Sequence, residues 1–88
     1  MSQRAWLRCE VTPGMFSNEY AVTIRTADDF PMSLFVPEEC LRDATLGEGQ
    51  LRVDVLDSDD NFSLVSLPRP SFERGSVAKV PRLAVTAA

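Results

Sequence analysis

The sequence predicts an all-β fold, and more specifically a small antiparallel barrel of five to six strands. Three short β-prone segments each begin at a serine and end where proline follows an aliphatic residue, at 33–37, 63–68 and 76–81. Proline has no N–H to donate to a neighbouring strand, so it marks the end or the edge of a strand. Two further segments, 5–11 and 50–57, alternate between apolar and polar residues with the period of a half-buried strand.

Closure of these strands into a barrel is expected because a short flat sheet would leave its edges exposed. An SH3-like arrangement is the first choice and an OB-like arrangement the second. The expected strands lie at 5–11, 19–26, 32–36, 50–57, 62–67 and 77–80.

One short helical turn is expected near 38–44, before the fourth strand. Pro37 suits the first position of a helix, and Glu38 and Glu39 suit the positive end of its dipole. The segment 58–61 reads as a hairpin turn between the fourth and fifth strands. Residues 1–88 are expected to form a single domain in which 82–88 are partly a frayed tail.

Composition agrees with a globular domain. Hydrophobic residues make up 44% of the chain, enough for one core, and charged residues make up 25%, which argues against disorder. No apolar run approaches the roughly 20 residues that span a bilayer, and the N-terminal residues do not resemble a signal peptide. We therefore expect a cytoplasmic protein without membrane contact.

The chain contains no histidine and only two cysteines, Cys9 and Cys40. Two thiols without histidine do not make a standard zinc site, and the usual Ser-His-Asp and Cys-His catalytic arrangements are excluded. In a cytosolic chain the two cysteines are expected to be reduced and structural. We expect no catalytic residue, no metal and no cofactor, and hence no enzyme.

Several acidic segments superficially resemble functional motifs. The run 57–61 begins like a calcium loop, but Phe62 occupies the position of the required glycine and Pro68 that of the glutamate ligand. The neighbouring acids at 28–29 and 38–39 point in different directions on a strand or a helix, so neither pair can aim two carboxylates at one substrate. The glycines at 47 and 49 lack the lysine of a phosphate-binding loop. These segments are interpreted as turns and connections.

Charge is distributed unevenly. Residues 1–66 carry five arginines against twelve carboxylates, whereas residues 67–88 carry four cations against one carboxylate. The basic C-terminal part can contact an acidic partner or lie against the acidic body of its own domain.

The outward-facing residues of the predicted strands form the candidate interaction surface. If Leu7 and Val53 line the core, then aromatic and aliphatic residues point outward beside arginines, a composition typical of binding surfaces. The predicted surface consists of Trp6, Arg8, Arg25, Phe35, Arg52 and Leu56. The domain's own loops or tail could also cover these residues.

The sequence therefore favours a non-catalytic module that binds another protein or its own copy, as a homodimer with Trp6 near the centre of the interface. The alternative is a nucleic-acid-binding barrel in which bases stack on Trp6 and Phe35 while arginines contact phosphates. The acidic body and the single lysine weigh against this alternative.

Overall fold

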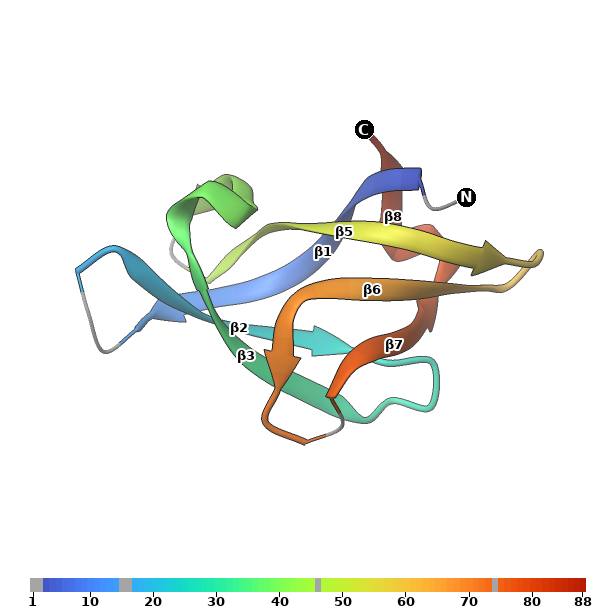
Figure 1. Cartoon of the computed structure of the whole chain (residues 1–88), viewed down its shortest axis with the longest axis horizontal. Coiled ribbons are helices and arrows are strands. Elements are labelled where there is room, and N and C mark those ends of the chain that lie inside the picture. The colour runs from blue at the N-terminus through green and yellow to red at the C-terminus, as the bar shows by residue number, and fades with distance from the viewer. Residues whose placement is uncertain (1–2, 15–16, 46, 74) are drawn as a thin grey trace.

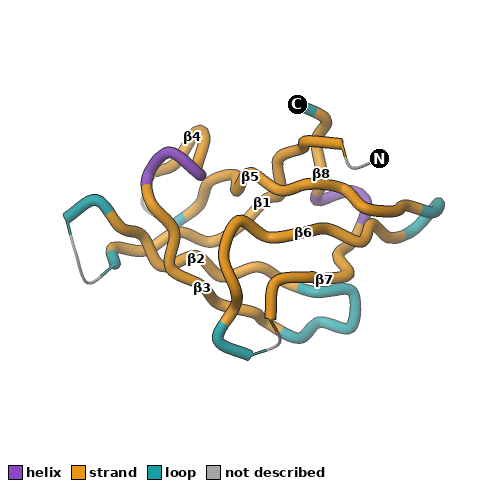
Figure 2. Tube along the Cα trace, viewed as in Figure 1, coloured by secondary structure: helices purple, strands orange, loops and turns teal. Residues whose placement is uncertain are grey.

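A computed structural model describes residues 3–14, 17–45, 47–73 and 75–88. It confirms an all-β domain, in which one antiparallel sheet curls into a half-barrel (Figures 1 and 2). Two short 3-10 turns interrupt the strands. In chain order the elements are β1 (Gln3–Pro13), β2 (Glu19–Arg25), β3 (Pro31–Pro37), η1 (Glu38–Cys40), β4 (Leu41–Thr45), β5 (Glu48–Ser58), β6 (Phe62–Ser71), β7 (Gly75–Pro81), η2 (Arg82–Ala84) and β8 (Val85–Ala87).

Strand β1 organises the sheet because three different strands, β2, β5 and β8, pair along its length. Its first part pairs with β5 from Gln3 to Cys9, and its last part pairs with β2 from Glu10 to Pro13. The main strand order is β3-β2-β1-β5-β6-β7, with β4 added beside β5 and β8 beside β1. The sequence predicts five to six strands; the main path has six, and β4 and β8 bring the sheet of the described residues to eight strands. The choice between an SH3-like and an OB-like arrangement stays a prediction.

The two ends of the sheet approach each other through the β6–β7 hairpin and the β2–β3 turn. The backbone N–H of Phe72 donates to the carbonyl of Ser33 at 2.8 Å, and the N–H of Ala27 donates to the carbonyl of Lys79 at 2.8 Å. The rings of Phe35 and Phe72 meet edge to face with centroids 5.2 Å apart. These contacts join the two ends of the curled sheet.

The structure differs from the sequence-based expectation at three places. Only Glu38–Cys40 is helical, because the residues that follow pair with β5, with Leu41 opposite Leu51. The last residues, expected to be partly frayed, form η2 and then β8, which pairs with β1. Strand β6 continues through Pro68 to Ser71, since its pairing with β7 is irregular there and a bulge tolerates proline.

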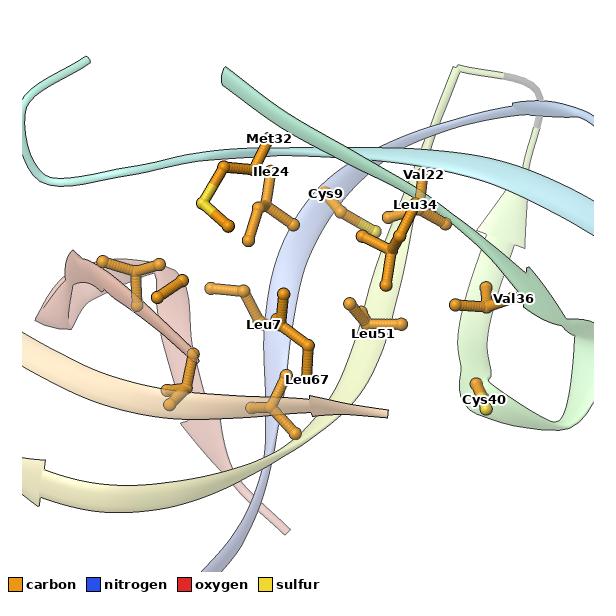
Figure 3. Packing of buried hydrophobic residues seen from close by; sticks show 14 of the residues in the cluster. Leu7, Cys9, Val22, Ile24, Met32, Leu34, Val36, Cys40, Leu51 and Leu67 are labelled. Carbon is orange, nitrogen blue, oxygen red and sulfur yellow. The ribbon is translucent and has the colours of Figure 1, made fainter. Parts of the chain in front are cut away.

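The core lies inside the curled sheet and follows the predicted alternation (Figure 3). Both cysteines are buried and free, and burial raises the pKa of the Cys9 thiol to about 12. The buried hydrophobic residues are Ala5, Leu7, Cys9, Val11, Val22, Ile24, Met32, Leu34, Val36, Cys40, Leu51, Val53, Val65, Leu67, Ala78 and Val80. With these positions facing inward, the residues between them on each strand face outward.

Candidate functional site: an arginine-rich face around Trp6

The site begins with the outward residues of β1. Arg4, Trp6 and Arg8 alternate with the buried Ala5 and Leu7, so all three side chains leave the same face of the strand. Arg4 and Arg8 are exposed, and Trp6 is half-buried. This spacing places one cation on each side of the only tryptophan of the chain.

Neighbouring strands add two more cations. On β5, Arg52 lies directly opposite Trp6, and Gln50 lies opposite Arg8. On β4, Arg42 lies opposite Gln50 and therefore one strand further from Arg8. We call this surface the Trp6 face; it consists of Arg4, Trp6, Arg8, Arg42, Gln50 and Arg52.

Arg42 is held in place by the rest of the face. Its guanidinium lies over the Trp6 ring, 4.5 Å from the centroid, and its Nη2 donates to Gln50 Oε1 at 2.6 Å. The Nε of Arg42 is buried without a hydrogen-bond partner among the described residues, and lies 3.8 Å from Asp43 Oδ2. A cation stacked on an aromatic ring is worth about 0.5–1 kcal/mol at an exposed site. Arg42 is thus partly preorganised before any ligand arrives.

The other three arginines differ in how they are held. The Nη2 of Arg52 lies 4.0 Å from the sulfur of Cys40 in η1, so this side chain packs between the sheet and the turn. In the part of the chain that the structure describes, neither Arg4 nor Arg8 forms an ion pair. Their guanidinium groups are therefore available to a partner.

Carboxylates border the face at both ends. Glu10 on β1 and Glu48 on β5 lie beyond Arg8, between the Cys9–Gly49 pair and the backbone hydrogen bonds that join Val11 to Gly47, and both are exposed. At the other end Asp54 lies opposite Arg4 and is also exposed. The positive charge therefore ends beyond Arg8 at two carboxylates, and Asp54 stands beside the cation at the other end, Arg4.

The structure brings together only part of the predicted surface. Trp6, Arg8 and Arg52 are neighbours, as described above. Arg25 lines the same groove of about 490 Å³ as Arg8 and forms an exposed ion pair with Asp29, with Nη1 and Oδ1 3.9 Å apart.

Phe35 and Leu56 lie away from the face. Phe35 is engaged by the ring of Phe72, and Leu56 lies at the irregular end of β5, near its hairpin turn. The predicted surface is therefore divided among several parts of the molecule.

Sequence reasoning missed Arg4, Arg42 and Gln50. Arg4 could have been found, because it continues the alternation of Trp6 and Arg8. Arg42 could not, because the sequence predicts a helical turn at this position and only the pairing of β4 with β5 brings the side chain over Trp6.

The acidic turn at 58–61 has a structural role. Oδ1 of Asp59 accepts hydrogen bonds from the backbone N–H groups of Asn61 and Phe62, each at 2.8 Å. These two hydrogen bonds lower the pKa of Asp59, with smaller contributions from the charges of Lys79 and Arg82. Two cations of the basic C-terminal part therefore lie near an acid of their own domain.

No protein-family model, curated protein or solved structure matches this chain. Among residues 3–14, 17–45, 47–73 and 75–88, no three His, Cys, Asp or Glu side chains are grouped so that they could hold a metal ion. Within those same ranges, no helix is both long and apolar enough to cross a membrane.

Proposed function

We propose that this protein is a non-catalytic module that binds another protein through the Trp6 face. The observation that carries the proposal is the concentration of four arginines around the single tryptophan in a chain whose net charge is −4. Tryptophan and arginine are the residue types most enriched at the energetic centres of protein interfaces. Two buried free thiols suit a reducing compartment, and we place the protein in the cytoplasm.

The charge of the face bears on what the partner is. A two-fold dimer centred on Trp6 would bring Arg4, Arg8, Arg42 and Arg52 of one copy against the same residues of the other. Juxtaposed like charges at an interface cost free energy and select against that partner. A different protein with an acidic surface is therefore the favoured partner, ahead of the homodimer.

Nucleic acid remains the second candidate, because arginines beside an aromatic ring also suit phosphates and bases. Two observations weigh against it. Phe35, the second base-stacking residue of that hypothesis, packs against Phe72. Carboxylates of Glu10, Glu48 and Asp54 border the cationic area and would repel a continuing phosphate backbone.

Affinity capture with matched variants tests the proposal. The wild type, Trp6→Ala and Arg8→Glu would each be immobilised, with Arg69→Glu, an exposed arginine on β6, as the control. We expect wild type and Arg69→Glu to retain a protein that Trp6→Ala and Arg8→Glu lose, whether or not nuclease is added. Equal capture by all four would contradict the proposal, and capture abolished by nuclease would support the nucleic-acid alternative.

Sedimentation addresses the homodimer separately. A monomer at micromolar concentration and above is expected if repulsion between the arginines dominates. A wild-type dimer that Trp6→Ala dissociates would instead establish self-association through this face.

A further inference from the structure

We propose that the Trp6 face binds a short extended acidic segment of its partner, with carboxylates at positions i and i+4 and an apolar residue at i+2. This inference rests on the proposed function and specifies the chemistry of its ligand. It follows from the length of the cationic area, from its borders and from the fixed position of Arg42.

The length of the cationic area limits the ligand. Arg4 and Arg8 are four residues apart on β1, which corresponds to about 13 Å at the rise of a strand. An extended segment covers this distance with about four residues, since it has the same rise. Beyond Arg8 the ligand meets Glu10 and Glu48, and at Arg4 it meets Asp54, which lies opposite Arg4 on β5. A short acidic segment fits within these borders, whereas a long polyanion runs past them.

Two pairs of arginines define where carboxylates are accepted. Arg8 and Arg42 lie in one cross-strand row, on either side of Gln50. Arg52 lies in the next row opposite Trp6, and Arg4 lies in the row beyond. One carboxylate can thus be placed near Arg8 and Arg42, and a second near Arg4 and Arg52. Arginine is well suited to this task because its planar group offers paired N–H donors to a carboxylate.

Trp6 determines the middle position of the ligand. It lies between Arg4 and Arg8 on β1 and opposite Arg52, is half-buried, and carries the Arg42 guanidinium over its ring. An apolar ligand side chain at i+2 would contact the remaining exposed part of Trp6 and exclude water from the flanking ion pairs. This desolvation strengthens the electrostatic contacts on either side.

Arg42 reduces the cost of binding. Its Nη2 is already bonded to Gln50 Oε1 and its plane is already stacked, while no described residue accepts a hydrogen bond from its Nη1. A carboxylate that reaches Nη1 therefore meets a donor whose rotamer is already selected. Ordering a long side chain at an interface otherwise costs about 0.5–1.5 kcal/mol.

Binding of labelled peptides to the full chain tests the inference. The probe is a fluorescein-labelled peptide with the sequence Gly-Glu-Ser-Leu-Ser-Glu-Gly; the comparison probes replace both glutamates by glutamine, or the leucine by serine. An eight-nucleotide thymidine oligonucleotide at the same ionic strength represents nucleic acid. Anisotropy reports binding, and emission from Trp6, the only tryptophan, reports whether the ligand reaches the face.

We expect the glutamate–leucine peptide to bind best, to change Trp6 emission, and to weaken as salt increases. Arg8→Gln should lower its affinity by about fivefold, the upper range for an exposed ion pair. Arg69→Gln should leave the affinity within about twofold, as expected for a surface charge outside the site. The glutamine peptide should bind at least about tenfold more weakly, because both ion-paired groups are lost.

Equal binding of the glutamate and glutamine peptides would overturn the inference, as would tighter binding of the oligonucleotide. If no peptide binds but capture of a protein still depends on Trp6 and Arg8, the proposed acidic ligand is wrong while the proposed function stands. Capture that is insensitive to both residues would overturn the proposed function together with this inference.

Discussion

Replacement of Val53 by aspartate tests the inward and outward assignment on which the whole account depends. Val53 lies in the middle of β5, pairs with Ala5 of β1, and is 2% exposed. Its neighbour Arg52 belongs to the Trp6 face, so a reversed assignment would exchange the core for the binding surface. The substitution places a carboxylate among aliphatic side chains that offer it no partner.

The expected loss approaches the total stability of the domain. Loss of the buried valine side chain costs about 1.5–3 kcal/mol, and an unpaired buried charge costs about 3–5 kcal/mol. For comparison, a domain of this length has a free energy of unfolding of about 4–13 kcal/mol. Val53→Asp is therefore expected to be largely unfolded at neutral pH.

Leu56→Asp is the matched control on the same strand. Leu56 is 45% exposed, and a surface substitution usually changes stability by about 0.5 kcal/mol or less. Circular dichroism during heating and in urea compares the two variants. A Val53→Asp melting temperature within a few degrees of wild type, or a greater loss in Leu56→Asp, would refute the assignment of faces.

Three further predictions concern features outside the Trp6 face. Mass spectrometry of denatured, alkylated protein prepared without reductant should find free thiols at both Cys9 and Cys40; a disulfide between them would contradict their structural role. Phe72→Ala should destabilise the domain by about 1 kcal/mol through loss of the Phe35 contact, as urea unfolding would measure; unchanged stability would show that the ring pair does not help to close the sheet. The lowered pKa of Asp59 stabilises the fold above the ordinary aspartate pKa, and this contribution disappears as the pH falls through the folded-state value. In thermal melts, Asp59→Asn should therefore unfold at a lower temperature than wild type at neutral pH, and the gap between the two melting temperatures should shrink in acid. A gap that stays constant across pH would contradict this.

The core could be predicted from sequence because it depends on alternation within each strand. Leu7 on β1 and Val53 on β5 are buried as expected, and the residues next to each of them along its strand face outward. Such patterns are local, and a strand's two-residue period carries them directly into three dimensions.

The complete site could not be predicted, because it depends on pairing between distant segments. The acidic residues after Pro37 favour a helical turn, and nothing nearby shows that Leu41–Thr45 pairs with β5. Asp43 adopts a positive φ of 53°, an uncommon conformation that the sequence alone does not specify. The contact between Arg42 and Trp6 follows from that pairing and therefore cannot be predicted from the local sequence.

Site-specific photocrosslinking tests most directly whether the Trp6 face is the functional surface. A photoreactive residue would replace Thr86, which lies opposite Trp6 on β8 and is exposed. A second preparation would carry it in place of Val77, which is 46% exposed on β7 and lies outside the face. We predict a crosslinked protein partner from position 86 that is absent from position 77 and lost when Arg8→Glu is added. Crosslinks from position 77 alone, or equal crosslinks from both positions, would contradict the assignment of function to this face.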